Sequence, residues 1–382
     1  MAVETSIGLH FKGLPDPRIE RCKAHALVDI LTIALCAVLC GGESWVDLET
    51  FGRQREAWLR TFLGLENGIP GHDTFARVFA RLDPAAFERC FLGWVRAVGP
   101  PEAGGQVAVD GKTVRGSHDR ANGKAALHLV SAWASASGLT LGQVAVDRKS
   151  NEITAIPALL DLLDLAGCVV SADAMGAQTA IAAQVVGKGG DYVLGLKANQ
   201  GQLHADVAAL FGRAEAAGFR DLPHTTAVEV EKGHGRIDKR TVRALGEREY
   251  LDWLDSRARW AGLQSVVMVE ATRRVGEGRE TERRYYISSL PPDAPRLAAA
   301  IRRHWGIENR LHWVLDVTFG EDDSRMRAGH SARNFALVRK IALNLLRTDP
   351  DKGSLATKRF KAALDPDYLA CLLTALPAPS LT

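Results

Sequence analysis

The chain has 382 residues, of which 46% are apolar and 24% charged, a balance that excludes a disordered protein and predicts a soluble globular one. Its net charge is only +3, so composition alone gives no argument for nucleic acid, and a DNA-binding surface would require local clusters of basic residues. The six cysteines form no CxxC pair and the N-terminus lacks a signal-peptide pattern, which predicts reduced core cysteines in a cytoplasmic protein.

Residues 1–100 are predicted to form a helical N-terminal domain. After an extended lead-in over residues 1–20, apolar residues recur at helical spacing in the segments 26–40, 46–63, 75–82 and 84–94. Asp29 interrupts the most hydrophobic segment, 26–40, which is also too short to span a membrane, so a buried helix is expected there. Asp73 or Thr74 is expected to cap the third helix. Two interpretations stay open: a dimerisation or packing module, and a domain that binds DNA ends.

Residues 101–350 are predicted to form a mixed α/β domain. Short apolar or alternating runs predict strands, and longer periodic runs predict helices at 153–165, 179–186 and 200–211. The predicted strands cover 107–110, 127–136, 139–146, 168–173 and 192–196. Two of them end in an acid, Asp110 and Asp173, and ligands of such sheets bind beyond the carboxyl ends of the strands.

Residues 222–290 are predicted to form a β-rich insertion in this domain. Arginines crowd around a turn near Gly278, but Glu277, Glu280 and Glu282 are interleaved with them, so a solvated hairpin explains them equally well. His234 lies in a glycine-flanked turn and is either a DNA-backbone contact or an ordinary turn residue. The arginines in question are Arg273, Arg274, Arg279, Arg283 and Arg284.

A helix is predicted over residues 294–315, with Asp293 and Pro295 at its start. Residues four apart share one face of a helix, so His304, Glu308, His312 and Asp316 form one line. We expect Trp305 and Leu311, beside that line, to anchor the helix in the core. An acid placed between histidines and tryptophans is therefore a candidate functional residue.

Asp110, Asp173 and Glu308 are the candidate catalytic and metal-binding residues. Carboxylate oxygens suit Mg²⁺ or Mn²⁺, and a pair of such ions activates the attacking oxygen and stabilises the leaving oxygen in phosphoryl transfer. Any one strand-end aspartate often only caps a turn, so the prediction depends on the combination. Asp316, Glu321 and Asp322 are alternatives to Glu308 as the third metal ligand. Asp316 is the better candidate of these, because it lies two helical turns beyond Glu308.

Basic residues near these acids are candidate DNA contacts. Lys112 and Arg115 follow the first aspartate, and Lys197 follows a predicted strand. Arg325 and Arg327 are the first residues of a basic stretch. We expect them to contact DNA phosphates, because cationic side chains supply most non-specific DNA affinity. Lys112, Arg115 and Lys197 have the alternative of being ordinary surface residues. Arg339 and Lys340 continue the basic stretch within an amphipathic helix predicted over residues 334–347. Residues 351–382 are predicted to be a basic helical tail, in which Lys358, Arg359 and Lys361 extend the positive surface.

The motifs resemble those of bacterial insertion-sequence transposases of the ISAs type, which include the H-repeat-associated proteins. The resemblance covers roughly residues 10–350 and rests on VDGKTVRGS (109–117), SADA (171–174), HWGIENRLHW (304–313) and LDVTFGED (315–322). IPGHDTFARVF (69–79) and LDPAAF (82–87) resemble the accessory domain of that group. The resemblance implies a ribonuclease-H-like core whose Asp-Asp-Glu triad is Asp110, Asp173 and Glu308. It also implies Mg²⁺-dependent cleavage of DNA ends, transfer into target DNA, and a homodimer on double-stranded DNA.

One departure from the wider transposase class concerns the DNA contacts around the glutamate. That class places a tyrosine, an arginine and a lysine where this chain has Ile301, His304 and Leu315. The roles of those residues therefore do not transfer. We hypothesise that His304, Asn309 or His312 contacts DNA instead.

Two rival functions stay open. A zinc-dependent hydrolase using His304, Glu308 and His312 has feasible four-residue spacing, but it lacks the HExxH pattern and leaves both aspartates without a role. A catalytically impaired DNA-binding remnant of a transposase is the other rival, although all the triad acids are present.

Overall fold

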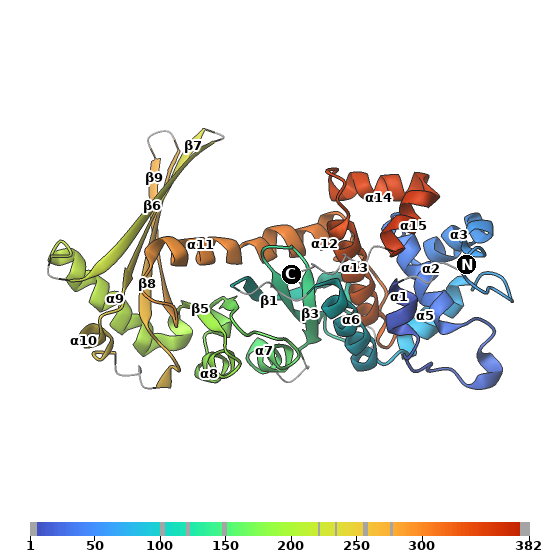
Figure 1. Ribbon diagram of the computed structural model, residues 1–382, viewed down its shortest axis with the longest axis horizontal. Helices are drawn as coiled ribbons and strands as arrows, with labels where there is room; N and C mark the ends of the chain where they lie inside the picture. Colours follow the sequence, from blue (N-terminus) through green and yellow to red (C-terminus); the bar gives the residue numbers. More distant parts are fainter. Residues whose placement is uncertain are drawn as a thin grey trace, which may run out of the picture.

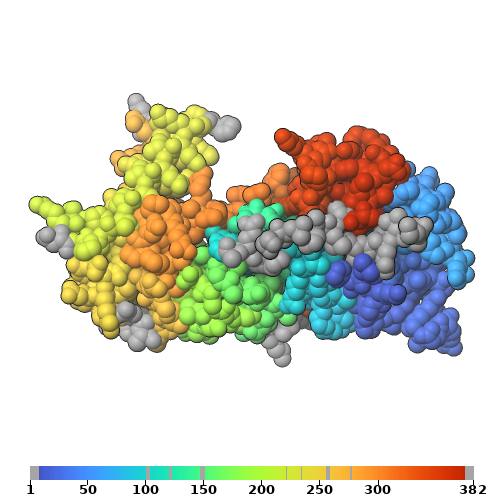
Figure 2. Space-filling model, in the orientation of Figure 1, coloured from blue at the N-terminus to red at the C-terminus, as the bar shows by residue number. Residues whose placement is uncertain are grey.

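The computed structural model describes residues 6–99, 104–119, 123–146, 151–220, 222–233, 235–254, 259–275 and 278–374. The molecule is elongated, with the N-terminal and C-terminal helices at one end, a long sheet through the middle, and a projecting arm of strands at the other end (Figure 1). Figure 2 shows a notch between this arm and the C-terminal helices.

Among the described residues, nine strands form a single mixed sheet in the order β3-β2-β1-β4-β5-β9-β8-β7-β6. β1 pairs antiparallel with β2 and β2 with β3, whereas β4 lies parallel to both β1 and β5. The predicted mixed α/β sheet is thus confirmed. Its first five strands are β1 (Gln106–Val114), β2 (Leu127–Ala134), β3 (Thr140–Ala145), β4 (Val169–Ala172) and β5 (Asp191–Leu196).

The predicted insertion is an antiparallel meander that continues the same sheet, because β9 pairs with β5. Sequence reasoning missed the second of its strands, whose charged residues hide the alternation. Ion pairs across the meander include Arg273–Asp238 at 3.0 Å and Arg283–Glu270 at 2.8 Å, so part of the arginine cluster is neutralised within the arm. His234 and residues 276–277 lie outside the described residues. The strands are β6 (His224–Gly233), β7 (Arg236–Leu245), β8 (Ser265–Val275) and β9 (Gly278–Ser288).

Helices cover both faces of the central sheet. α11 (Ala294–His304) packs on one face, where Val169 and Val193 are buried with Leu297. The alternate residues Val170 and Leu194 belong to the other face's core, which also contains α7 (Glu152–Asp161) and α8 (Thr179–Gly187). This two-sided burial explains why both strands read as continuous apolar runs. α9 (Gly201–Ala216) packs against β9, and α10 spans Arg248–Leu251.

The N-terminal helices surround α13 (Ser331–Thr348), which packs against α2, α5, α6 and β3 (Figure 1). The predicted extended lead-in is wrong in part, because it contains a helix, and the predicted helix 46–63 is broken at Arg55. Gly71 is the N-cap of α5, so Asp73 and Thr74 lie inside that helix and do not cap it. The helices of this end are α1 (Ser6–Phe11), α2 (Leu27–Leu39), α3 (Trp45–Gln54), α4 (Glu56–Leu59), α5 (His72–Arg81), α6 (Pro84–Val98), α14 (Leu355–Leu364) and α15 (Pro366–Thr374).

The most hydrophobic helix, α2, is buried in this bundle as predicted, with Ile30, Ile33 and Ala34 at 0% exposure. Within the described residues, Glu20–Leu39 is the one helical segment long and apolar enough to cross a membrane, but 61% of its apolar window is buried inside the protein. Its apolar partner is therefore the rest of the chain. Of the cysteines, Cys36 and Cys168 are buried as expected, but Cys22 and Cys371 are exposed.

The predicted positive surface of the C-terminal segment is largely wrong. Arg339 and Lys340 are fully buried in α13, and Lys358 and Arg359 are buried in α14. Lys358 donates to the carbonyls of Leu346 and Asp349, and these bonds satisfy the buried ammonium inside the protein. The periodic basic residues therefore belong to the core of the helical end.

Candidate functional site

The sheet places Asp110 and Asp173 side by side. The last residue pair between the parallel strands β1 and β4 is Val109–Ala172. Asp110 is the next residue of β1, and Asp173 directly follows the end of β4. Adjacent strands lie about 4.8 Å apart, so the two acids start from neighbouring positions. β1 does not end at Asp110 as predicted; it continues to Val114, paired with β2. The Asp173 carboxylate accepts a hydrogen bond from the Met175 amide at 2.9 Å.

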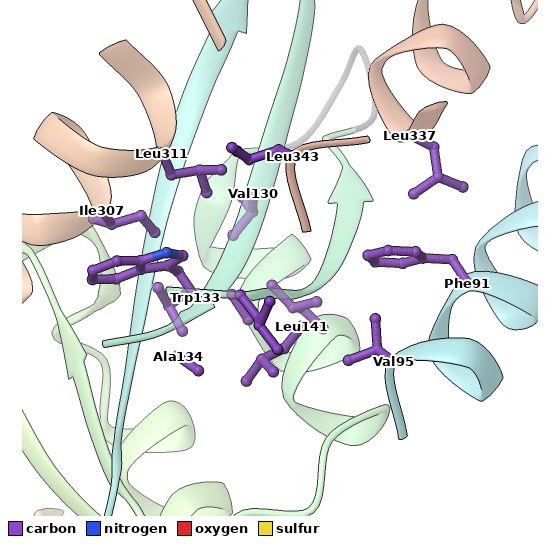
Figure 3. Packing of buried hydrophobic residues seen from close by; sticks show 14 of the residues in the cluster. Phe91, Val95, Val130, Trp133, Ala134, Leu141, Ile307, Leu311, Leu337 and Leu343 are labelled. Atoms are coloured by element: carbon purple, nitrogen blue, oxygen red, sulfur yellow. The ribbon is translucent and has the colours of Figure 1, made fainter. Parts of the chain in front are cut away.

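Glu308 lies opposite these strand ends, on the predicted helix. α11 ends at His304 and is followed by the π-helical segment η6 (Ile307–His312) and then α12 (Trp313–Val317). A π segment widens the helix by one residue per turn and is frequent at functional sites. Ile307 and Leu311 of this segment pack around Trp133 of β2 (Figure 3). Glu308, between them in sequence, is exposed.

Close backbone approach explains this contact between the glutamate helix and the sheet. A side chain at Gly306 would place its Cβ atom 2.6 Å from the Trp133 ring, so glycine lets the helix lie against the indole. Leu311 is buried as predicted. Trp305 is not a core anchor: it is 39% exposed, and the Arg284 guanidinium stacks over its ring at 5.0 Å.

The electrostatics show that the three acids interact. Burial raises the pKa of the Asp110 carboxyl to about 7, and nearby carboxylates add to this rise. Those carboxylates are Asp173, Glu152 and Glu308. Burial also raises the pKa of Glu308, and Asp173 raises it further, against the opposing effects of Arg284 and Lys197. The site therefore carries negative charge that the surrounding protein cations do not balance at Asp110.

The donor set fits a hard divalent cation. Its side chains are carboxylates, the ligands that Mg²⁺ and Mn²⁺ prefer, and the unbalanced negative charge at Asp110 is what such an ion would offset. Within the part of the chain that the structure describes, no group of three His, Cys, Asp or Glu side chains already converges as a metal-ligand cluster. This applies equally to the zinc set His304, Glu308 and His312.

Both helix histidines turn toward the strands. His304 Nδ1 lies 3.1 Å from the Ser171 hydroxyl of β4, and burial lowers the pKa of its imidazole. His312 Nδ1 lies 3.5 Å from Asp110 Oδ2, and burial, with the nearby Lys340 and Lys112, lowers the pKa of His312 to about 3. His312 is therefore neutral at physiological pH, so its contact with Asp110 is not a salt bridge.

Lys112 faces the protein interior. Its side chain is only 9% exposed, and its ammonium lies 2.6 Å from Asp316, 3.1 Å from Glu321 and 3.0 Å from Asp322. All three rival acids, Asp316, Glu321 and Asp322, are thus ion-paired with Lys112. Glu321 is fully buried, and the neighbouring Lys340 and Lys112 keep its pKa low despite that burial.

The other predicted DNA contacts differ in exposure. Lys197, Asn309 and Arg325 are exposed. Arg115 is exposed as well, and its guanidinium lies 3.4 Å from Asp322. Arg327 is half-buried and donates to the Gly116 carbonyl at 2.9 Å. The charge of Lys197 opposes the rise in the pKa of Glu308, so Lys197 lies near the candidate site.

Sequence reasoning missed a cavity beside Glu308. It has a volume of about 680 Å³ and lies between the β7–β9 strands and the α11–η6 helix. Trp305, Asn309, Arg310 and Arg284 line its end nearest the glutamate. The arginine-rich stretch was the available signal, but only the fold shows that the sheet and the helix enclose it.

Sequence reasoning also missed Glu152 and His128. Glu152 is the first residue of α7, and its carboxylate lies 2.6 Å from His128 Nε2 of β2. An acid in the first turn of a helix is the ordinary complement to the helix dipole, so the sequence carried no signal that Glu152 lies near Asp110.

Comparison with protein families gives two matches. Residues 9–95 match the model described as "DDE_Tnp_1-associated", and residues 102–345 match the one described as "Transposase DDE domain". The chain is 39% identical to the "H repeat-associated putative transposase YhhI" of Escherichia coli K12, over 95% of this chain and 96% of that protein. It is 41% identical to the "Putative transposase YncI" of Escherichia coli O157:H7, over 93% and 91%. The "Inactive transposase YbfQ" of Escherichia coli K12 is 43% identical, over 19% of this chain and 86% of that protein.

Proposed function

Because the chain belongs to the family of DDE transposases, within its H-repeat group, we propose that it cleaves the DNA ends of an insertion sequence and joins them to target DNA. The arrangement of Asp110, Asp173 and Glu308 supports this activity most directly. Two acids start from adjacent parallel strands, and the third faces them from a helix, within range to raise the pKa of Asp110.

The strand order 3-2-1-4-5 supports a ribonuclease-H-like core for this domain, with β6–β9 as an insertion at its edge. We place the N-terminal domain at residues 1–100, the catalytic domain at 101–350 and a C-terminal helical tail at 351–382. α13 packs against both the first domain and β3, which favours a fixed relationship between the two domains.

Asp110, Asp173 and Glu308 would hold Mg²⁺ or Mn²⁺, as a pair of ions. When bound, such ions stabilise charge on the attacking and leaving oxygens of a phosphodiester. The protein's own part is to fix the acids. Lys112 ties β1 to the segment after Glu308, and His304 ties α11 to β4. Neutral His312 lies beside Asp110 and brings no positive charge that would compete with a cation for that carboxylate.

Exposed cations around the site support double-stranded DNA as the substrate. Lys197, whose charge opposes the raised pKa of Glu308, is exposed, as are Arg115 and Arg325. Asn309 of η6 is also exposed, and Arg327 adds a half-buried charge. The inward-facing Lys112, His304 and His312 are better placed to position the acids than to contact DNA. We further propose action in the cytoplasm, as a homodimer on paired DNA ends.

The test is cleavage of a labelled duplex carrying the DNA ends that flank the gene, with Mg²⁺, Mn²⁺ or EDTA. Nicking at the element boundary that requires the divalent ion supports the proposal. DNA binding without nicking in either metal would instead identify a binding remnant. Zinc bound stoichiometrically in the purified protein, with no DNA activity, would favour a zinc hydrolase.

A further inference from the structure

The hydrogen-bonded pair of Glu152 and His128 lies against the backbone of the candidate site. The imidazole is held from both sides: Nε2 lies 2.6 Å from Glu152 Oε1, and Nδ1 lies 2.8 Å from the Thr113 hydroxyl of β1. β2 and β1 thus fix the imidazole, and the imidazole fixes the carboxylate. Glu152 is only 18% exposed, so its orientation is restricted.

Gly111 provides the space for this pair. A Cβ atom built at Gly111 would lie 2.1 Å from Glu152 Oε1 and 2.6 Å from His128 Nε2. The two side chains therefore occupy the volume that any other residue's side chain would need. Gly111 directly follows Asp110 in β1, so the Glu152 carboxylate lies against the strand one residue from the first candidate acid. It is near enough to raise the pKa of Asp110.

A structural reading explains only part of this arrangement. A glutamate in the first turn of α7 complements the helix dipole wherever its side chain points. Here His128 of β2 directs the Glu152 side chain toward Gly111 of β1. Glu152 thereby lies near Asp110, whose negative charge repels it. Bringing another carboxylate toward Asp110, Asp173 and Glu308 is unfavourable unless a cation shares the site.

We infer that Glu152, oriented by His128, is a positioning residue of the divalent-cation centre, and that it strengthens cation binding at Asp110. The inference rests on the proposed function and adds a carboxylate outside the Asp-Asp-Glu set. Outer carboxylates of this kind orient the ligands and the water around a bound ion. His128 acts through Glu152 and makes no contact of its own with the ion.

The test measures Mn²⁺ affinity by titration calorimetry and cleavage of the element end as a function of Mn²⁺ concentration. Glu152→Gln keeps the size of the side chain and removes its charge. Loss of an outer ligand costs about 10–100-fold in metal affinity, so we expect a weaker Kd by this factor and cleavage restored at higher Mn²⁺. Asp161→Asn, an exposed acid at the other end of α7, is the matched control and should leave both measurements unchanged.

His128→Gln should weaken Mn²⁺ binding in the same direction. The double variant should be no worse than Glu152→Gln alone, because His128 acts through Glu152. Circular dichroism checks that the Glu152→Gln variant is folded. If the folded variant binds Mn²⁺ with the wild-type affinity, the inference is overturned. Glu308→Gln separates the two claims: if it loses cleavage while Glu152→Gln matches wild type, the inference alone fails. If wild-type protein binds no Mn²⁺, both fail.

Discussion

The ammonium of Lys112 lies 2.6 Å from the Asp316 carboxylate and joins the strand of Asp110 to the helix that follows Glu308. Lys112 is two residues beyond Asp110, and Asp316 is two helical turns beyond Glu308. Glu321 and Asp322 complete the same ion-pair cluster. The relative position of two candidate catalytic acids is therefore fixed by a charge cluster beside them.

Replacing Lys112 with methionine should destabilise the protein strongly. The change leaves the carboxylates of a mostly buried cluster without their shared cation, and breaking a buried ion pair costs about 3–5 kcal/mol. Urea unfolding measures this loss. Lys352→Met, at an exposed position, should stay within about 0.5 kcal/mol of wild type. Equal effects of the two changes would show that the cluster does not stabilise the fold.

The contribution of Asp110 to the stability of metal-free protein should fall as the pH rises from about 4 to about 7. The lowered pKa of His312 acts in the opposite direction, so this contribution is the difference in stability between wild type and Asp110→Asn. The Asp110 pKa is raised to about 7 in the folded state from 3.8, so folded protein binds the extra proton in this window and loses that advantage as it ionises. The upper limit of the effect is on the order of 4 kcal/mol. Thermal unfolding of both proteins in EDTA measures how this difference changes with pH.

Added Mn²⁺ should reverse this loss above pH 7, because a bound cation stabilises the ionised carboxylate. An ion at 100 times its dissociation constant adds about 2.7 kcal/mol. The same addition should leave Asp110→Asn nearly unchanged. A difference between wild type and Asp110→Asn in EDTA that does not change with pH would contradict the raised pKa of Asp110.

Gly306→Ala should push the glutamate helix away from the sheet, since the added Cβ meets the six-membered ring of Trp133 at 2.6 Å. Overpacking of this kind costs about 1–3 kcal/mol. Trp133→Phe removes part of that ring, so the alanine should cost less in the Trp133→Phe background. A double-mutant cycle of unfolding free energies measures this coupling. Additive effects would mean that the two residues do not limit the approach of the helix.

Sequence patterns were sufficient for the strands that carry Asp110 and Asp173 and for the helix that carries Glu308. Short apolar runs predicted the strands, and Asp293 with Pro295 predicted the start of the helix. These signals lie within the elements themselves, so no knowledge of the fold was needed. The sequence did not predict β7, because its charged residues obscure the alternating pattern of a strand. In the structure these residues pair across the arm, as Asp238 does with Arg273.

Contacts between distant segments could not be read in the same way. Arg339 and Lys340 lie in a basic stretch of the sequence, yet α13 packs against α2, α5, α6 and β3, and both side chains are buried. Glu152 precedes Glu308 by more than 150 residues, and only the fold brings both near Asp110. The π segment at Glu308 likewise depends on how Ile307 and Leu311 fit around Trp133.

The most direct test of a shared cation site is to replace the divalent ion with Fe²⁺ and generate hydroxyl radicals with ascorbate. The radicals cut the protein backbone near the bound iron, and the fragments identify the segments around it. We predict cuts near Asp110, Asp173 and Glu308 that excess Mg²⁺ suppresses and that weaken in Glu308→Gln. Cuts confined to another part of the chain, or cuts that Mg²⁺ and Glu308→Gln leave unchanged, would contradict the account.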